Sequence, residues 1–139
     1  MVYVLDASFS AAVILPDETS AEVKQAFSAI GEKDEISVPH LWWYEMGNLL
    51  RKNVIRKRYT YEMALSFVAA LSTFYANTDS SSGALYTQKL FQLAEAYELS
   101  VYDAAYLELA LRGTSGLTAL YTLDKGLKTA AISAGLTVA

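Results

Sequence analysis

The sequence predicts an α/β fold: a three-layer sandwich in which a central twisted parallel sheet is flanked by helices. Short apolar runs rich in β-branched residues alternate along the chain with longer segments of helical periodicity. Helices of this length between strands imply parallel pairing with right-handed crossovers, which place helices on both faces of the sheet. Because 139 residues are typical of one ordinary domain, we expect a single domain over residues 1–139.

The first half of the chain divides where polar residues and proline break the apolar spacing. Val2–Leu5 is a short run with β-branched and aromatic residues, which favours a buried strand, and this strand ends at Asp6. A second strand, at residues 36–38, stops at Pro39. Helices are expected over residues 19–30, 42–56 and 61–75.

The second half continues the alternation of helices and strands. Residues 77–83 form a polar break that is too short for a linker between domains. Helices are expected over residues 87–98 and from Ser100, a candidate N-cap, to Arg112. A strand at residues 117–121, a last helix between Asp124 and Gly135, and a final strand at residues 136–138 complete the expected elements.

Four acidic residues stand in unusually apolar or small-residue surroundings: Asp6, Glu45, Asp103 and Asp124. The expected elements put Asp6 and Asp124 at the carboxyl ends of strands, where open parallel sheets bind ligands, and put the other two near helix starts. Like charges about 5 Å apart repel by roughly 3 kcal/mol at an effective dielectric of about 20, so clustered carboxylates either take up protons or hold cations. Oxygen ligands favour Mg²⁺ or Mn²⁺. Taken singly, each acid is explained as well by a helix cap or a solvated loop.

The net charge of −4 argues at first against a nucleic-acid partner, because affinity for phosphates comes mainly from Lys and Arg. This objection to a nucleic-acid partner holds only if the chain binds no metal ions. Two divalent cations among the acids would bring the loaded chain close to neutral.

Composition also indicates the setting in which the chain works. The absence of cysteine excludes disulfide and thiolate chemistry and favours a reducing compartment. No stretch approaches the roughly 18 apolar residues of a membrane span, and the first residues lack a basic leader, so we expect a cytoplasmic protein without a membrane partner. A hydrophobic share of 53% is high for so small a chain, so either the core is dense or a partner covers apolar surface, and we expect a homodimer.

Four groups of residues, in a fixed order, resemble the motifs of a known family. They are Leu5-Asp-Ala-Ser8 with Pro16-Asp-Glu18 soon after, Val38-Pro39 followed by Glu45 and Asn48, the run Leu99-Ser-Val-Tyr-Asp-Ala-Ala-Tyr-Leu-Glu-Leu-Ala110, and Tyr121-Thr-Leu-Asp124 with Leu127, Ala130, Ala131 and Gly135. Each is weakly specific alone, but together they cover nearly the whole chain. In order and spacing the sequence resembles the PIN-domain family and, within it, the VapC-type toxins of toxin–antitoxin pairs.

The resemblance implies a metal-dependent ribonuclease whose acids bind one or two Mg²⁺ or Mn²⁺ ions. By position, Asp6, Asp103 and Asp124 would be metal ligands, and Glu45 a ligand or a residue that orients water. A water activated by the metal would cleave RNA to leave a 5′-phosphate and a 3′-hydroxyl, with no histidine or cysteine nucleophile. A bare domain of this kind resembles a toxin, whose partners would be RNA and a cognate antitoxin.

Other residues match the supporting positions of the family. Ser8 and Thr122 match small hydroxyl residues that hold the ligands in place, and Asn48 matches a polar residue one helical turn after the glutamate. From the sequence itself, Ser8 and Thr122 are explained equally well as turn hydroxyls, and Asn48 as a solvated side chain.

The densest basic cluster consists of Arg51, Lys52 and Arg56 together with the adjoining pair at residues 57–58. It lies on or just beyond the helix that carries Glu45, so these side chains are candidates for binding RNA phosphates beside the metals. Basic residues at a helix end also interact favourably with the helix dipole and keep a protein soluble, so both explanations stay open.

Other function classes fit the sequence less well. A signalling receiver domain needs an acidic pair at its first strand, whereas Asp6 has no acidic neighbour and Asp103 is expected in a helix. A haloacid-dehalogenase-like phosphatase needs Asp at position 8, where this chain has Ser, and no glycine-rich phosphate loop is present. Two alternatives to the toxin remain within the PIN fold. One is a nuclease that acts in RNA processing, and the other is a binding module without catalytic activity.

Overall fold

The computed structural model describes all 139 residues and contains five strands and seven helices. The strands are β1 (Val2–Leu5), β2 (Glu35–Pro39), β3 (Asn77–Asp79), β4 (Thr118–Tyr121) and β5 (Thr137–Val138). They form one parallel sheet in the order β3-β2-β1-β4-β5. The helices are α1 (Ala7–Ile14), α2 (Ala21–Ser28), α3 (Leu41–Ile55), α4 (Tyr61–Leu71), α5 (Ala84–Tyr97), α6 (Val101–Leu111) and α7 (Lys125–Ser133).

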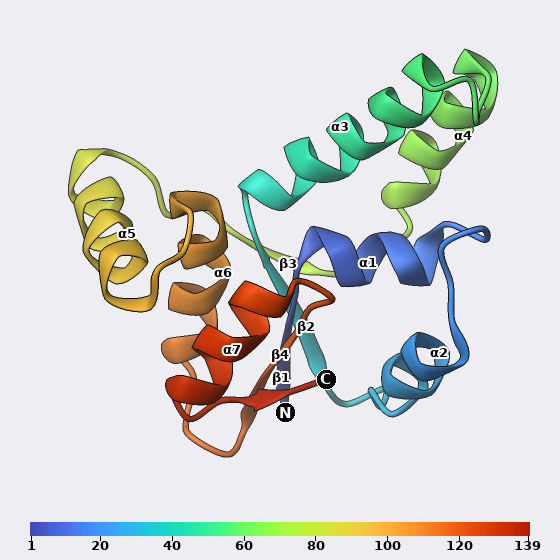
Figure 1. Cartoon of the computed structure of the whole chain (residues 1–139). Helices are drawn as coiled ribbons and strands as arrows, with labels where there is room; N and C mark the ends of the chain where they lie inside the picture. The colour runs from blue at the N-terminus through green and yellow to red at the C-terminus, as the bar shows by residue number, and fades with distance from the viewer.

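Helices cover both faces of this sheet (Figure 1). On one face, Val4, Val38 and Leu120 pack in one buried cluster with residues of α6 and α7. On the other face, the neighbouring strand positions Leu5 and Tyr121 pack with residues of α1 and α2. Successive side chains of a strand point to opposite faces, so the central strand β1, which is covered on both faces, is apolar throughout. The expected three-layer α/β sandwich is confirmed.

Helices α3 and α4 pack together and project beyond the carboxyl ends of the strands (Figure 1). Met46 and Leu50 of α3 and Ala64 and Leu71 of α4 are buried between this pair and the main core. The outer side of α4 carries a stripe of exposed apolar side chains. None of the seven helices combines the length and the apolar composition that crossing a membrane requires.

Two elements of the structure are not predicted by the sequence pattern. Residues 7–14 form α1, in which four consecutive residues, 9–12, are buried, so the helix shows no amphipathic stripe. Residues 77–79 form β3, inside the segment expected to be a polar break. A polar edge strand of three residues is identified only by its pairing with β2, and the sequence contains no local signal for it.

Helix boundaries differ from the expected ones by a few residues. The helix expected to reach residue 75 ends at Leu71, because the hydroxyls of Ser72 and Thr73 bond to carbonyls of the last turn. Helix α5 starts at Ala84, three residues earlier than expected, directly after Gly83, whose φ of 94° marks the change of chain direction.

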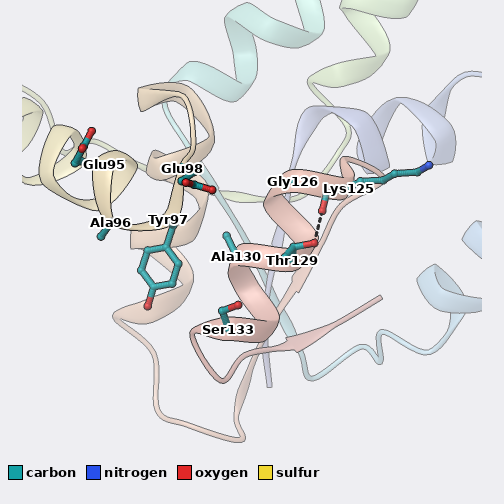
Figure 2. Close-up of a pocket in the computed structure, with 9 residues that line it drawn as sticks. All are labelled: Glu95, Ala96, Tyr97, Glu98, Lys125, Gly126, Thr129, Ala130 and Ser133. Atoms are coloured by element: carbon teal, nitrogen blue, oxygen red, sulfur yellow. Dashed lines mark hydrogen bonds between the residues drawn. The ribbon is translucent and has the colours of Figure 1, made fainter.

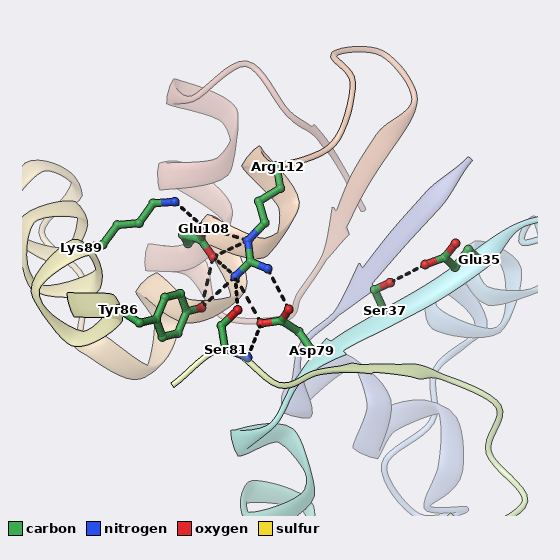
Figure 3. Close-up of polar contacts among 8 residues, drawn as sticks. All are labelled: Glu35, Ser37, Asp79, Ser81, Tyr86, Lys89, Glu108 and Arg112. Atoms are coloured by element: carbon green, nitrogen blue, oxygen red, sulfur yellow. Dashed lines mark hydrogen bonds and ion pairs between the residues drawn. The ribbon is translucent and has the colours of Figure 1, made fainter. Parts of the chain in front are cut away.

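An ion-pair network around the buried carboxylate of Glu108, here called the Arg112 network, joins β3 to α5 and α6 (Figure 3). Arg112 contacts Oε2 of Glu108 at 2.5 Å and binds both carboxylate oxygens of Asp79, at 2.7 and 3.2 Å. Glu108, only 3% exposed, also accepts hydrogen bonds from Lys89 and Tyr86. Burial alone would raise the pKa of Glu108, but the hydrogen bonds from Arg112 and Lys89 outweigh it and hold that pKa below its ordinary value.

The strand register brings the expected site residues to one edge of the sheet. Leu5 and Tyr121 are paired at the ends of the adjacent strands β1 and β4, so the two residues that follow them, Asp6 and Thr122, leave the sheet side by side. Helix α3 begins shortly after β2 ends, which brings its first turns to the same edge. This edge is where an open parallel sheet binds its ligands.

Candidate active site

Asp6 is the fixed centre of the candidate site. It caps α1, and its Oδ1 accepts a hydrogen bond from the backbone N–H of Phe9 at 2.8 Å. The Ser8 hydroxyl donates to the carboxylate, at 2.7 Å from Oδ1 and 2.9 Å from Oδ2, and Thr122 Oγ1 donates to Oδ2 at 2.5 Å. Since Asp6 is only 4% exposed, these donors replace the water that burial removes.

Ser8 and Thr122 also hold the loop that leads to Asp124. Thr122 Oγ1 accepts from the backbone N–H of Asp124 at 3.0 Å, and Ser8 Oγ accepts from that of Leu123 at 3.0 Å. Asp124 then caps α7, where its Oδ1 accepts from the backbone N–H of Leu127 at 2.8 Å. The two hydroxyl residues therefore connect the acid after β1 with the acid after β4.

Glu45 and Asp103 reach the site from two helices. Glu45, on α3, is half-buried, and its Oε2 accepts a hydrogen bond from the hydroxyl of Tyr106 at 2.5 Å. Asp103 lies in the first turn of α6, which Ser100 caps. Tyr106 is not among the residues expected from the sequence. The i, i+3 spacing of Asp103 and Tyr106 puts both on one side of α6 and was the available signal.

Burial and like charge act together on Asp6. Burial raises its pKa above the ordinary value, and the hydrogen bonds from Phe9, Thr122 and Ser8 offset this only in part. The charge of Asp124 adds to the increase. The site therefore resists a negative charge at Asp6 unless another group compensates for it.

The two helical acids are affected in the same way. Burial raises the pKa of Glu45; the hydrogen bond from Tyr106 opposes this, and the charges of Asp103 and Asp6 add to it. The pKa of Asp103 is raised first by burial and then by the charges of Asp124 and Asp6. None of the chain's five ion pairs includes any of the four acids. The acids are thus near enough to repel one another, and no ion pair neutralises them.

The four acids do not converge on a single point as they stand. No three of the His, Asp and Glu side chains lie close enough together to surround one metal ion. Asp6 is held by its donors, whereas Asp124 is exposed, and Glu45 and Asp103 are half-buried. The four acids fit a hard divalent cation, because they offer only carboxylate oxygens as metal ligands and no basic side chain neutralises their charge.

The structure does not bring the remaining expected residues to the acids. Asn48 is exposed one turn beyond Glu45 on α3 and takes no part in the hydrogen bonds around the carboxylates. Arg51, Lys52 and Arg56 are also exposed and lie further along α3, toward the end that projects from the sheet (Figure 1). They form none of the chain's ion pairs.

A groove of about 680 Å³ lies between α5 and α7 (Figure 2). Glu95 and Glu98 line it on one side, and Lys125 and Thr129 on the other. Lys125 follows Asp124 directly, so the groove reaches the neighbourhood of the site. The carboxylates of Glu95 and Glu98 disfavour a nucleic-acid backbone in this groove. The chemistry of the four-acid site does not depend on the groove.

The PIN-domain family model matches residues 3–132, which is nearly the whole chain. The chain therefore belongs to the PIN-domain family. Among its relatives, Ribonuclease VapC3 from Pyrobaculum aerophilum is 34% identical over 110 residues, which are 79% of this chain and 82% of that protein. The resemblance to VapC-type proteins drawn from the sequence motifs is confirmed.

Solved structures share the fold at lower identity. PAE2754 from Pyrobaculum aerophilum is 22% identical with a TM-score of 0.71, and the match covers 99% of this chain and 89% of that one. VapBC2 from Rickettsia felis, bound to a DNA fragment from its promoter, is 16% identical with a TM-score of 0.67, over 100% of this chain and 98% of that one. VapBC-1 from nontypeable Haemophilus influenzae is 13% identical with a TM-score of 0.61, over 100% and 97%.

Proposed function

We propose that this protein is a divalent-metal-dependent endoribonuclease and the toxin of a toxin–antitoxin pair. The observation that carries the proposal is the set of four carboxylates, Asp6, Glu45, Asp103 and Asp124, which interact through their charges and lack neutralising partners. The name of the VapC3 relative supports RNA as the substrate.

Mg²⁺ or Mn²⁺ is the proposed cofactor. Asp6, Asp103 and Asp124 would hold the ion, with Glu45 as a further ligand or as the residue that orients water. A divalent cation bound there would lower the pKa of a coordinated water and offset the charge that builds on the attacked phosphate. Because no three acids already converge, the site must be completed by those of them whose side chains can still rotate.

The chain's own residues position these groups. Ser8 and Thr122 hold Asp6 in one orientation, and Tyr106 does the same for Glu45. Carboxylates that are already oriented lose less side-chain entropy when substrate and cation bind, which is how supporting residues contribute to rate.

The exposed polar residues of α3 have a separate proposed role. Asn48 lies on the turn after Glu45 and would contact the RNA backbone near the cut. Arg51, Lys52 and Arg56 would bind phosphates further along the strand, and this role explains basic side chains that pair with no acid of the chain.

The partners follow from the same proposal. A toxin of this kind is held inactive by a cognate antitoxin in the cytoplasm, and the single domain over residues 1–139 forms a homodimer. Three large apolar side chains on the outer side of α4 support association with a partner: Tyr61, Leu65 and Val68 are 65%, 52% and 46% exposed.

Cleavage of single-stranded RNA tests the proposal. We expect the purified protein to cut RNA with Mg²⁺ or Mn²⁺, to leave 5′-phosphate ends, and to stop in EDTA. Asp103→Asn keeps the volume and removes the charge, so cleavage should fall at least about a hundredfold. Glu32→Gln, at an exposed acid outside the site, is the matched control and should cleave like the wild type. Undiminished cleavage in EDTA, or by Asp103→Asn, contradicts the mechanism.

A further inference from the structure

A second pocket, of about 470 Å³, lies beyond the carboxyl ends of β2 and β3, between the start of α3 and helix α5. Its lining includes His40, Leu41, Tyr44, Asp79, Ser81 and Tyr86. Tyr44 precedes Glu45 in the chain, and Leu41 lies one helical turn before it. The pocket and the carboxylate site are therefore both built from the first two turns of α3.

The rim of this pocket is aromatic. The ring of Tyr44 is 70% exposed, and its hydroxyl lies 3.3 Å from Nε2 of His40. The two rings are 5.5 Å apart between centroids, with their planes at 38°. A large ring that the fold leaves open, steadied by a second ring, is a surface on which a planar ligand can stack.

The lining of the pocket combines apolar side chains, among them Leu90, with one polar side that includes Asp79, Ser81 and Tyr86. The polar side is formed by part of the Arg112 network, in which Arg112 also lies 3.2 Å from the Ser81 hydroxyl and 3.3 Å from that of Tyr86 (Figure 3). The two acids of the network are balanced by Arg112 and Lys89. Such a lining has no excess positive charge to attract a phosphate, and the Ser81 hydroxyl, which accepts from Arg112, can still donate to a polar group of a ligand.

We infer that this pocket binds one unstacked base of single-stranded RNA beside the bond that is cut, with Tyr44 stacking on the base as a substrate-positioning residue. The inference rests on the proposed function, since it places RNA at the neighbouring carboxylates. An aromatic rim beside a polar side that carries hydroxyls matches the way proteins read splayed RNA bases, by stacking and by hydrogen bonds to base edges. The volume lies in the range of pockets that enclose small planar ligands, roughly 300–1,000 Å³.

Binding of a labelled RNA oligonucleotide tests this role apart from catalysis. Fluorescence anisotropy is measured in the wild-type background with a single-stranded RNA that spans a cleavage site and carries a non-hydrolysable analogue of the scissile phosphate, so that the ligand stays intact while the acids keep their cation. Adding Tyr44→Ala should weaken binding about tenfold, whereas Tyr44→Phe keeps the ring and should stay within about twofold. Tyr75→Ala removes another exposed ring that does not line the pocket and should leave binding unchanged.

An abasic series locates the base and completes the test. Replacing one base near the cut by an abasic residue should weaken binding as much as Tyr44→Ala does, and the two changes together should cost no more than either alone. Equal binding by Tyr44→Ala and its background, or fully additive losses, would overturn the inference. If Tyr44→Ala does not fold, the abasic series alone decides, and a series in which no position weakens binding would overturn the inference. Absence of RNA cleavage by the wild type would count against the proposed function, while cleavage without these effects would count against the pocket alone.

Discussion

Tyr106 and Tyr59 make the same kind of contact in two different places. Each is a buried tyrosine whose hydroxyl donates to a carboxylate, Tyr106 to Glu45 in the candidate site and Tyr59 to Asp17 outside it. Removing the hydroxyl from each tyrosine in turn therefore separates the effect of the hydrogen bond on stability, expected in both variants, from its effect on catalysis, expected only for Tyr106.

We predict that Tyr106→Phe lowers the rate of RNA cleavage by roughly three- to tenfold, because Glu45 loses the donor that orients it. The free energy of unfolding should fall by only about 1 kcal/mol, since the ring still fills its site. Tyr59→Phe should have a similar effect on stability, measured by urea unfolding, and none on the cleavage rate. Equal losses of rate in the two variants would show that Tyr106 acts only through stability.

At the level of single residues, the sequence allowed the acids to be found but not their supports. Asp6 and Asp124 stood out because apolar neighbours surround them and strands precede them. Ser8 and Thr122 match family positions; Ser8 reaches Asp6 locally, two residues along the chain, whereas only the register of β1 with β4 places Thr122 against Asp6. Tyr106 lies in the buried run Ala104–Glu108 of α6, so its ring is explained by the core, and only its spacing of three residues from Asp103 pointed to the site.

The elements differ in how far local pattern could predict them. Strand β1 and helix α3 have clear apolar patterns, because each buries a defined surface. Strand β3 is polar and short, and it is held by the pairing with β2 and by the contact of Asp79 with Arg112, both of which are long-range. Its position follows from packing, and no local propensity indicates it.

The Arg112 network should make the attachment of β3 depend on pH. Hydrogen bonds from Arg112 hold the pKa values of Glu108 and Asp79 below their ordinary values against the effect of burial. Their contribution to stability is therefore fully present above the unfolded-state carboxyl pKa of about 4 and is lost as pH falls through the folded-state values.

We predict that Arg112→Met lowers the free energy of unfolding by about 2 kcal/mol at pH 7, because Glu108 stays buried with fewer partners. The difference from the wild type should shrink as the pH is lowered below about 4. Urea unfolding at a series of pH values measures it, with Arg56→Met, an exposed arginine in no ion pair, as the matched control. A difference that stays constant or grows on acidification contradicts this account of the network.

At the scale of the whole molecule, the outer side of α4 offers an apolar surface to a partner. Tyr61, Leu65 and Val68 lie at i, i+4 and i+7, so they form one continuous stripe that the chain itself does not cover. An exposed stripe of this kind favours association with a second copy.

We predict that light scattering after size-exclusion chromatography gives twice the chain mass of 15.2 kDa. Leu65→Glu should shift the protein to a monomer, because a buried unpaired carboxylate opposes association. Leu85→Glu, at another exposed leucine, should leave the dimer intact. A wild-type protein that is monomeric at all accessible concentrations, or a dimer unaffected by Leu65→Glu, would rule out this surface.

The overall charge also bears on how the molecule meets RNA. A chain with a net charge of −4 has little general attraction for a polyanion, so the proposed RNA binding would depend on cations at the acids and on the local basic residues of α3. Two arguments thus support the proposed metal: the repulsion among the four acids and the charge of the proposed substrate.

Anomalous scattering from crystals soaked in Mn²⁺ tests the central claim most directly. The account predicts a manganese peak at the carboxyl edge of the sheet, about 2.0–2.3 Å from carboxylate oxygens of Asp6 and of at least one of Asp103 and Asp124. The peak should be absent from crystals of Asp103→Asn prepared in the same way. A wild-type map without manganese among these acids, from protein that cleaves RNA, would contradict the claim that they form the metal site.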